Sequence, residues 1–271
     1  MNGTDLRKNR LFNQGLNAVI IAIDHGMFDG PIPGMIDLQE TAEKISPVVD
    51  GILLSPGMIK HLQSSFNFKG APMPIVRVNW STVYCFHWNY NAARTVTAQS
   101  VYDAVASGAE MVLISLTIGT GDEDTDAKNV EVFSALKSEA EKLGIPVLGE
   151  YFPIYSDKLT LKELHEKVYA SCRILSELGA DMIKTFYTNN FKAVTNSCPV
   201  PIFGLGAEKT PRQIDALQLA RNEIDDGARG VVFGRNAIQV PDPSAFQQAL
   251  CEIVKKGVDP ENAVKKFNLK D

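Results

Sequence analysis

The stretch Glu177-Leu-Gly179-Ala180-Asp-Met-Ile-Lys184 decides the fold, because its pattern of helix end, Gly, Ala and strand returns elsewhere in the chain. It returns as Ala106-Ser-Gly108-Ala109-Glu-Met-Val-Leu and as Asp226-Gly227-Ala228-Arg-Gly-Val-Val. A glycine at such a junction is typical of a helix C-terminus. Repeated helix-to-strand junctions indicate repeated βαβ units and therefore a parallel sheet.

Eight short apolar runs predict the strands of that sheet. They are rich in Val, Ile and Leu, as strands covered on both faces should be, and they span residues 18–24, 51–55, 74–79, 111–116, 146–151, 181–186, 200–204 and 230–234. Eight strands alternating with helices in 271 residues predict an α/β fold, a single (β/α)₈ TIM barrel with parallel strands. The rival is a doubly wound sheet, which usually carries a glycine-rich dinucleotide turn, and Gly26-Met-Phe-Asp-Gly30 does not fit that turn.

We expect one domain over residues 1–271, because no linker, charge block or composition shift divides the chain. The polar segment 257–271 is expected to be a mobile tail. The composition is that of a globular protein, with 45% hydrophobic residues and a net charge of -5, which argues against a nucleic-acid partner. We find no apolar run of membrane-spanning length, no signal peptide and no close cysteine spacing, and therefore expect no membrane partner and a cytoplasmic location.

Polar residues that share a strand face point to a functional site. Alternate residues of a barrel strand face the interior, so Asp24, Asn79, Tyr151 and Lys184 would converge at the carboxyl ends of four strands if those faces are the inner ones. Active sites of such barrels lie at that end. A lysine inside an apolar run is unusual unless it is paired or functional. The alternatives are a solvated Lys184, a packed Tyr151, and a turn at Asp24 that caps its own backbone.

Two glycine-containing loops follow the seventh and eighth predicted strands. The first is Gly204-Leu-Gly206-Ala207-Glu208-Lys209 and the second is Gly234-Arg235-Asn236. These two loops bind phosphate in many barrels, through backbone N–H groups and helix N-termini, and Arg235 would add a charged fork. The alternative is that the glycines only turn the chain.

The acidic run at residues 121–127 invites a calcium interpretation, but it fails the EF-hand pattern because Ala127 replaces the required Gly. An acidic helix start is the favoured interpretation. We expect no metal site.

The motifs, taken in order, resemble one family. Ile23-Asp24-His25-Gly26 with Gly30-Pro31 looks like the first-strand motif of the archaeal-type class I fructose-bisphosphate aldolases. That group includes the aminodideoxyheptulosonate synthases and the enzymes that process phosphorylated autoinducer-2. Further resemblances extend the match to residue 239, and they are Gly149-Glu-Tyr151, Gly179-Ala-Asp-Met-Ile-Lys184-Thr and Val232-Phe-Gly234-Arg235-Asn236-Ala-Ile-Gln239.

The resemblance implies a barrel that forms an imine between a lysine and a ketose phosphate. By resemblance, Lys184 is the nucleophile, Tyr151 the proton-transfer residue and Asp24 a polar partner near the imine. The substrate would be held by a set of six residues: Gly206, Ala207, Gly234, Arg235, His25 and Asn79. No cofactor is implied, because the iminium acts as the electron sink. A large homo-oligomer, such as a decamer, is also implied.

Three stretches depart from the family pattern. Ala207 replaces the second of two adjacent glycines, Thr117-Ile-Gly-Thr-Gly-Asp-Glu-Asp differs from the usual fourth-strand end, and Tyr151-Phe-Pro-Ile-Tyr155 lacks the usual arginine. We expect Phe28, Trp80, Trp88 and Tyr155 to shape the pocket. The open alternatives are a transaldolase or heptulosonate-type synthase, a thiolase using the same imine, a barrel isomerase without an imine, and a non-catalytic phosphosugar-binding barrel.

Overall fold

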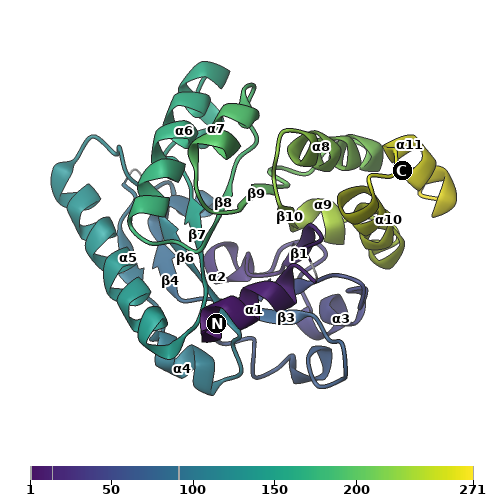
Figure 1. Ribbon diagram of the computed structural model, residues 1–271, viewed down its shortest axis with the longest axis horizontal. Coiled ribbons are helices and arrows are strands. Elements are labelled where there is room, and N and C mark those ends of the chain that lie inside the picture. Colours follow the sequence, from purple (N-terminus) through teal and green to yellow (C-terminus); the bar gives the residue numbers. More distant parts are fainter. Residues whose placement is uncertain (1, 14, 91, 271) are drawn as a thin grey trace.

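The computed structural model describes residues 2–13, 15–90 and 92–270. Its strands close into a parallel barrel in the order β1-β10-β9-β8-β7-β6-β3-β2, which confirms the predicted (β/α)₈ fold (Figure 1). The barrel strands are β1 (Ala18–Ala22), β2 (Gly51–Leu54), β3 (Met73–Arg77), β6 (Met111–Leu116), β7 (Val147–Tyr151), β8 (Met182–Thr185), β9 (Ile202–Leu205) and β10 (Gly230–Phe233). All eight predicted runs are barrel strands, and β1 closes the ring by pairing Ala18 with Gly230.

The helices lie around the barrel, with α1 before β1 at its amino end and the others later in the chain (Figure 1). They are α1 (Gly3–Leu11), α2 (Gly26–Asp29), α3 (Leu38–Glu43), α4 (Val101–Ala106), α5 (Glu123–Leu143), α6 (Leu161–Glu177), α7 (Phe191–Ser197), α8 (Gln213–Asp225), α9 (Arg235–Ile238), α10 (Pro243–Lys256) and α11 (Pro260–Lys266). Short 3-10 turns are η1 (Gln63–Ser65), η2 (Thr82–Tyr84), η3 (Phe86–Trp88) and η4 (Ser156–Lys158). None of the helices in the described ranges has the length and apolar character that a membrane span requires.

The connection from β3 to β6 carries an insertion beside the barrel. In it β4 (Asn79–Ser81) and β5 (Thr95–Thr97) form an antiparallel pair, with η2 and η3 between them. Asn129 of α5 ties the insertion down, because its side chain bonds to the backbone of Ala93 and Thr95. The insertion therefore has a fixed position at the carboxyl end of the barrel.

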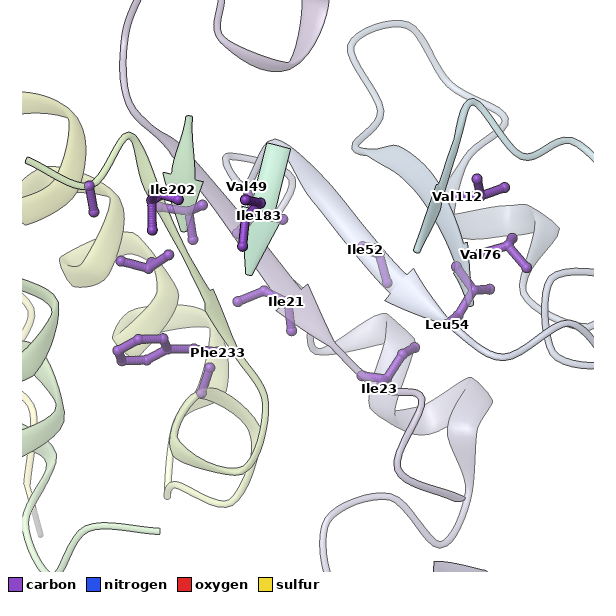
Figure 2. Packing of buried hydrophobic residues seen from close by; sticks show 14 of the residues in the cluster. Ile21, Ile23, Val49, Ile52, Leu54, Val76, Val112, Ile183, Ile202 and Phe233 are labelled. Atoms are coloured by element: carbon purple, nitrogen blue, oxygen red, sulfur yellow. The ribbon is translucent and has the colours of Figure 1, made fainter. Parts of the chain in front are cut away.

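The two faces of the strands differ in what they contact. Outward branched side chains such as Ile21, Ile52 and Val112 pack under the helices (Figure 2). Inward side chains form a second core, which includes Ile20, Leu148 and other residues near the amino ends of the strands. α1 closes that end, since Leu11 belongs to this inner core and α1 crosses the ring of strands in Figure 1. The interior is therefore filled at the amino end, as barrel interiors are.

Two predicted segments have defined structures. The acidic run starts α5, with Asp122 as the N-cap, so the favoured interpretation of a helix start is confirmed. Part of the expected tail forms α11, where Ala263 is buried against the neighbouring helices. The mobility of segment 257–271 and the single-domain organisation stay predictions, and residue 271 lies outside the described residues.

Candidate active site

A cavity of about 800 Å³ opens at the carboxyl ends of the strands. Its floor is formed by side chains that end the inner faces of β1, β3, β7 and β8, and its rim by the loops that follow β1, β7, β9 and β10. The predicted residues Asp24, His25 and Lys184 line it, as do four loop residues: Gly206, Ala207, Gly234 and Arg235. The barrel thus brings together most of the predicted site.

Four charged side chains form one chain of ion pairs on the cavity floor. Arg77 Nε lies 2.6 Å from Asp24 Oδ2, and Arg77 Nη2 lies 2.6 Å from Glu150 Oε2. Glu150 Oε1 lies 2.5 Å from Lys184 Nζ. All four side chains are at least 91% buried. Two carboxylates and two cations balance, which is how buried charges are retained in proteins. We call this set, Asp24, Arg77, Glu150 and Lys184, the charge cluster.

The pairing in the charge cluster keeps its carboxylates ionised. Burial by itself raises the pKa of Asp24 and of Glu150, but Arg77 and Lys184 outweigh it, so each pKa lies below its ordinary value. Burial lowers the pKa of Arg77, but the same two carboxylates raise it well above its ordinary value. Glu150 is therefore a carboxylate that faces an amine across a short hydrogen bond.

Tyr84, from the inserted η2, completes the surroundings of Glu150. Its hydroxyl donates to Glu150 Oε2 at 2.8 Å, and the Arg77 guanidinium lies 4.8 Å from the centre of its ring. Burial, followed by the Glu150 charge, raises the pKa of Tyr84 well above its ordinary value. Tyr84 is a protonated donor that holds the carboxylate in place.

The loops after β9 and β10 form the opposite rim. Arg235 donates from Nη2 to the carbonyl of Ala207, while its buried Nε has no partner in the described part of the chain. Gly234 lies so close to His25 that a Cβ there would be 2.4 Å from the ring. Burial lowers the pKa of His25 to about 4, with the nearby Lys184 and Arg235 acting in the same direction and Asp24 opposing them. The rim therefore combines a neutral imidazole with an arginine whose donors are only partly used.

The loop after β9 differs from the expected phosphate cradle. The N–H of Gly206 donates to Val232 O at 3.1 Å within the barrel, so it is already bonded. Ala207 has a φ of +49°, a left-handed conformation that glycine adopts without strain. The backbone thus keeps the shape that a glycine would favour although the residue is Ala.

The expected position of Tyr151 in the barrel interior is wrong. Tyr151 is fully buried in the outer core beneath the helices and does not line the cavity. Gly149, two residues earlier, faces outward with it, and a Cβ on Gly149 would be 3.2 Å from Leu175 of α6 and 3.0 Å from the Cβ of Ala180 just after that helix. The close approach of the helix layer at Gly149 therefore turns Leu148 and Glu150 inward.

Asn79 also lies outside the cavity lining. Its amide nitrogen donates to Ser115 O at 2.7 Å, and its carbonyl accepts from the Ser115 N–H at 2.9 Å. Both ends of the side chain are thus used to fasten β4 to β6, and Asn79 is a scaffold residue beneath the insertion. Trp80, Trp88 and Tyr155 are likewise absent from the cavity lining, whereas Phe28 is part of it.

Three residues of the candidate site were not assigned from the sequence: Arg77, Glu150 and Tyr84. A signal for Glu150 is present, since a carboxylate inside the run Val147-Leu-Gly-Glu-Tyr is as unusual as Lys184 in its own strand. Tyr84 carries no such signal, because it reaches the site only through the fold of the inserted segment. In the described ranges, no three His, Cys, Asp or Glu side chains converge as metal ligands.

A parallel barrel with an amine and paired carboxylates at the carboxyl ends of its strands defines a class of barrel enzymes that act on small molecules. The chain belongs to the DeoC/LacD family of aldolases, whose model matches residues 18–240. This family assignment confirms the resemblance drawn from the motifs.

Individual relatives are similar over nearly the whole chain. An uncharacterized aldolase of Saccharolobus solfataricus is 32% identical over 98% of this chain and 99% of its own. A 3-hydroxy-5-phosphonooxypentane-2,4-dione thiolase of Yersinia enterocolitica is 28% identical over 98% of this chain and 87% of its own. The structure also resembles that of an archaeal fructose-1,6-bisphosphate aldolase, solved with its catalytic lysine covalently bound to a carbinolamine intermediate. The TM-score is 0.77 and the sequence identity 28%, over 93% of this chain and 99% of that one. The chain is thus similar to enzymes of aldolase type.

Proposed function

We propose that this chain is a class I aldolase that cleaves or forms a C–C bond in a phosphorylated ketose through an imine on Lys184. The observation that carries the proposal is the position of Lys184 Nζ on the cavity floor, 2.5 Å from Glu150 Oε1. An amine attacks a carbonyl only in its neutral form, and a carboxylate in direct contact is a route for its proton.

The reaction follows from these contacts. Lys184 Nζ attacks the ketone, and Glu150 passes a proton to the carbinolamine oxygen, which leaves as water to give the iminium. Glu150 then accepts the proton of the C4 hydroxyl. The C3–C4 bond breaks, its electron pair enters the iminium to form an enamine, and the aldehyde leaves. Glu150 returns this proton to C3 of the enamine, and hydrolysis by water then releases the ketone product and restores Lys184. This assigns to Glu150 the proton transfer that the sequence suggested for Tyr151.

The remaining residues hold the substrate. In the proposal the phosphate binds at the rim, where Arg235 has a buried Nε without a partner. Asp24 holds Arg77, and Arg77 holds Glu150, so these two residues position the proton acceptor. Fixed geometry of this kind supplies a large part of the rate enhancement in such reactions.

Borohydride trapping tests the imine. The protein is incubated with dihydroxyacetone phosphate, reduced, and analysed by intact mass and peptide mapping. The expected result is a stable adduct on Lys184. Lys184→Met should form no adduct, and its turnover should be lower by at least ~10³-fold. Lys167→Met is the control, since this lysine lies outside the cavity lining. An adduct on another lysine, or full turnover in Lys184→Met, would overturn the proposal.

A matched pair of variants tests the proton transfer. Glu150→Gln keeps the shape of the side chain but cannot accept a proton, and should lower kcat by about 10²–10⁴-fold. Tyr151→Phe should leave kcat within twofold, because the hydroxyl lies in the outer core. The opposite pattern would return the role to Tyr151.

A second use of the same imine is favoured by the similarity to a protein named as a thiolase. In that case a thiol, rather than an aldehyde, would take up the carbon fragment. Formation of a thioester from a phosphorylated 2,4-dione and a thiol, with no aldehyde produced, would select this function.

A further inference from the structure

The cavity has two chemically different walls. The wall formed by the loops after β9 and β10 carries two basic side chains, Arg235 and Lys209, and one acidic side chain, Glu208. The facing wall, formed by α2, the insertion and the segments after β7 and β8, is aromatic. Five aromatic side chains of this wall line the cavity: Phe28, Tyr84, Phe86, Phe152 and Phe186. We call these five rings the aromatic wall.

The rings of the aromatic wall form a continuous surface. Phe152 lies at its centre, with ring-centre distances of 4.7 Å to Tyr84 and 4.9 Å to Phe186. Phe28 and Phe86 extend it, at 4.8 Å from Tyr84 and 6.2 Å from Phe152. Because Tyr84 also bonds to Glu150, this surface begins at the proton acceptor. The part of a bound substrate beyond Glu150 would therefore lie beside these rings.

The charges beside the aromatic wall are unsuited to a second phosphate. Asp29 and Asp157 line the cavity there, and the carboxylate oxygen Asp29 Oδ1 is buried without a hydrogen-bond partner in the described residues. His87 Nε2 is 4.0 Å from Asp29 Oδ1, and Arg77 is paired with two carboxylates through Nε and Nη2, which leaves only its Nη1 without a hydrogen-bond partner in the described residues. Lys158, next to Asp157 in the chain, lies over the Tyr155 ring and not in the cavity lining. A dianionic group at this wall would face carboxylates and lose its hydration against phenyl rings.

We propose that the aldehyde half of the substrate is uncharged and carries an apolar group, so that the substrate is a ketose 1-phosphate and not a bisphosphate. This inference rests on the proposed function. The phosphate of the ketone half binds at the Arg235 rim, and the chain beyond C4 packs on the aromatic wall. Cleavage sends the C4 hydroxyl proton to Glu150 and the C3–C4 electron pair to the iminium, giving dihydroxyacetone phosphate and an apolar aldehyde.

Acceptor competition in the direction of synthesis tests the inference. Dihydroxyacetone phosphate is the donor, and phenylacetaldehyde, hexanal, glyceraldehyde and glyceraldehyde 3-phosphate are the acceptors. We expect kcat/KM to be at least ~10-fold higher for the two apolar aldehydes than for glyceraldehyde 3-phosphate, since burial of an apolar group favours its transition state by such factors. A kcat/KM for glyceraldehyde 3-phosphate equal to or above that of the apolar aldehydes would overturn the inference.

Two variants sharpen the test. Asp157→Lys should raise kcat/KM for glyceraldehyde 3-phosphate relative to hexanal by ~10-fold, because it removes one repelling charge and adds an attracting one. Phe86→Ala should lower the preference for phenylacetaldehyde over glyceraldehyde by ~5-fold or more. Asp124→Lys, an exposed change on α5 outside the cavity lining, is the control and should leave both ratios unchanged. Unaltered ratios in both test variants would also overturn the inference.

Different results contradict the proposed function and the inference about the aldehyde half. If dihydroxyacetone phosphate gives no adduct on Lys184, the proposed function fails and the inference fails with it. If the adduct forms and glyceraldehyde 3-phosphate is the best acceptor, the imine mechanism stands and only the inference about the aldehyde half is wrong.

Discussion

The charge cluster and Glu223 are two buried places where the same barrel shifts the pKa of carboxyl groups in opposite directions. In the charge cluster, Arg77 and Lys184 pair with the carboxylates and the pKa of Asp24 and Glu150 is lowered. Glu223, on α8, is fully buried, and neither of its carboxyl oxygens has a hydrogen-bond partner in the described residues. Burial raises its pKa well above the ordinary value. Depth alone therefore does not set ionisation, and the presence of a partner does.

The absence of a side chain at Gly204 leaves the space in which Glu223 is buried. A Cβ on Gly204 would lie 2.1 Å from the Glu223 carboxyl carbon, so the carboxyl group occupies the space that a side chain on β9 would need. Gly204 faces the helices, whereas the charge cluster lies on the inner side of the barrel. The cavity floor thus carries the paired charged groups, and the helix layer carries an unpaired carboxyl group whose pKa is raised by burial.

The largest expected change comes from breaking the charge cluster. Arg77→Met should lower the free energy of unfolding by about 3–5 kcal/mol at pH 7, because it leaves Asp24 and Glu150 buried with one cation. Urea denaturation measures this loss. Arg173→Met is the matched control, since its pair with Glu177 is exposed and its loss should cost less than about 1 kcal/mol. Equal losses in the two variants would mean that the charge cluster is no more strongly coupled than a surface pair.

The next effect separates the two regions by their pH dependence. Because the pKa of Glu223 is raised in the folded state, its proton favours folding only at low pH, and stability falls as pH rises from the ordinary value of 4.5 towards the folded value. The slope for one proton is at most about 1.4 kcal/mol per pH unit. Glu223→Gln should flatten this slope, which urea midpoints at pH 5, 6 and 7.5 measure.

The charge cluster has the opposite sign. Because their pKa values are lowered in the folded state, Asp24 and Glu150 stabilise the fold at pH values above their ordinary pKa. This contribution is lost as pH falls through their folded-state pKa values.

Glu131→Gln, an exposed change on α5, is the control for Glu223→Gln and should leave the pH profile unchanged. Parallel profiles for Glu223→Gln and the unaltered protein would show that Glu223 is ionised in both states.

The smallest effect concerns backbone strain in the loop after β9, close to the Glu223 site. Ala207→Gly should stabilise the fold by about 0.5–1 kcal/mol, because Ala207 has a φ of +49°. Ala135→Gly, at an exposed position inside α5, should instead destabilise it by about 1 kcal/mol. Thermal unfolding of the two variants measures both signs. A loss of stability in Ala207→Gly would mean that the backbone at Ala207 is not strained. The buried carboxyl group of Glu223 would then be the only destabilising feature of the two beside β9.

The sequence by itself determined the barrel and part of its site. Repeated junctions such as Gly179-Ala180 mark the helix-to-strand joints, and the placement of Lys184 and Asp24 at strand ends followed from the apolar runs around them. These features are local, because a strand end or a helix cap depends on a few neighbouring residues. The family assignment agrees with the motifs that occur in order along the chain.

Only the tertiary structure decided which face of β7 points inward. The sequence shows that Gly149 and Tyr151 share a face, but the approach of the helix layer at Gly149 assigns that face to the outside and gives the cavity Glu150. Tyr84 likewise reaches Glu150 across 66 positions, through an inserted segment. Alternation along a strand fixes only relative direction, whereas barrel closure and helix packing fix which direction is inside.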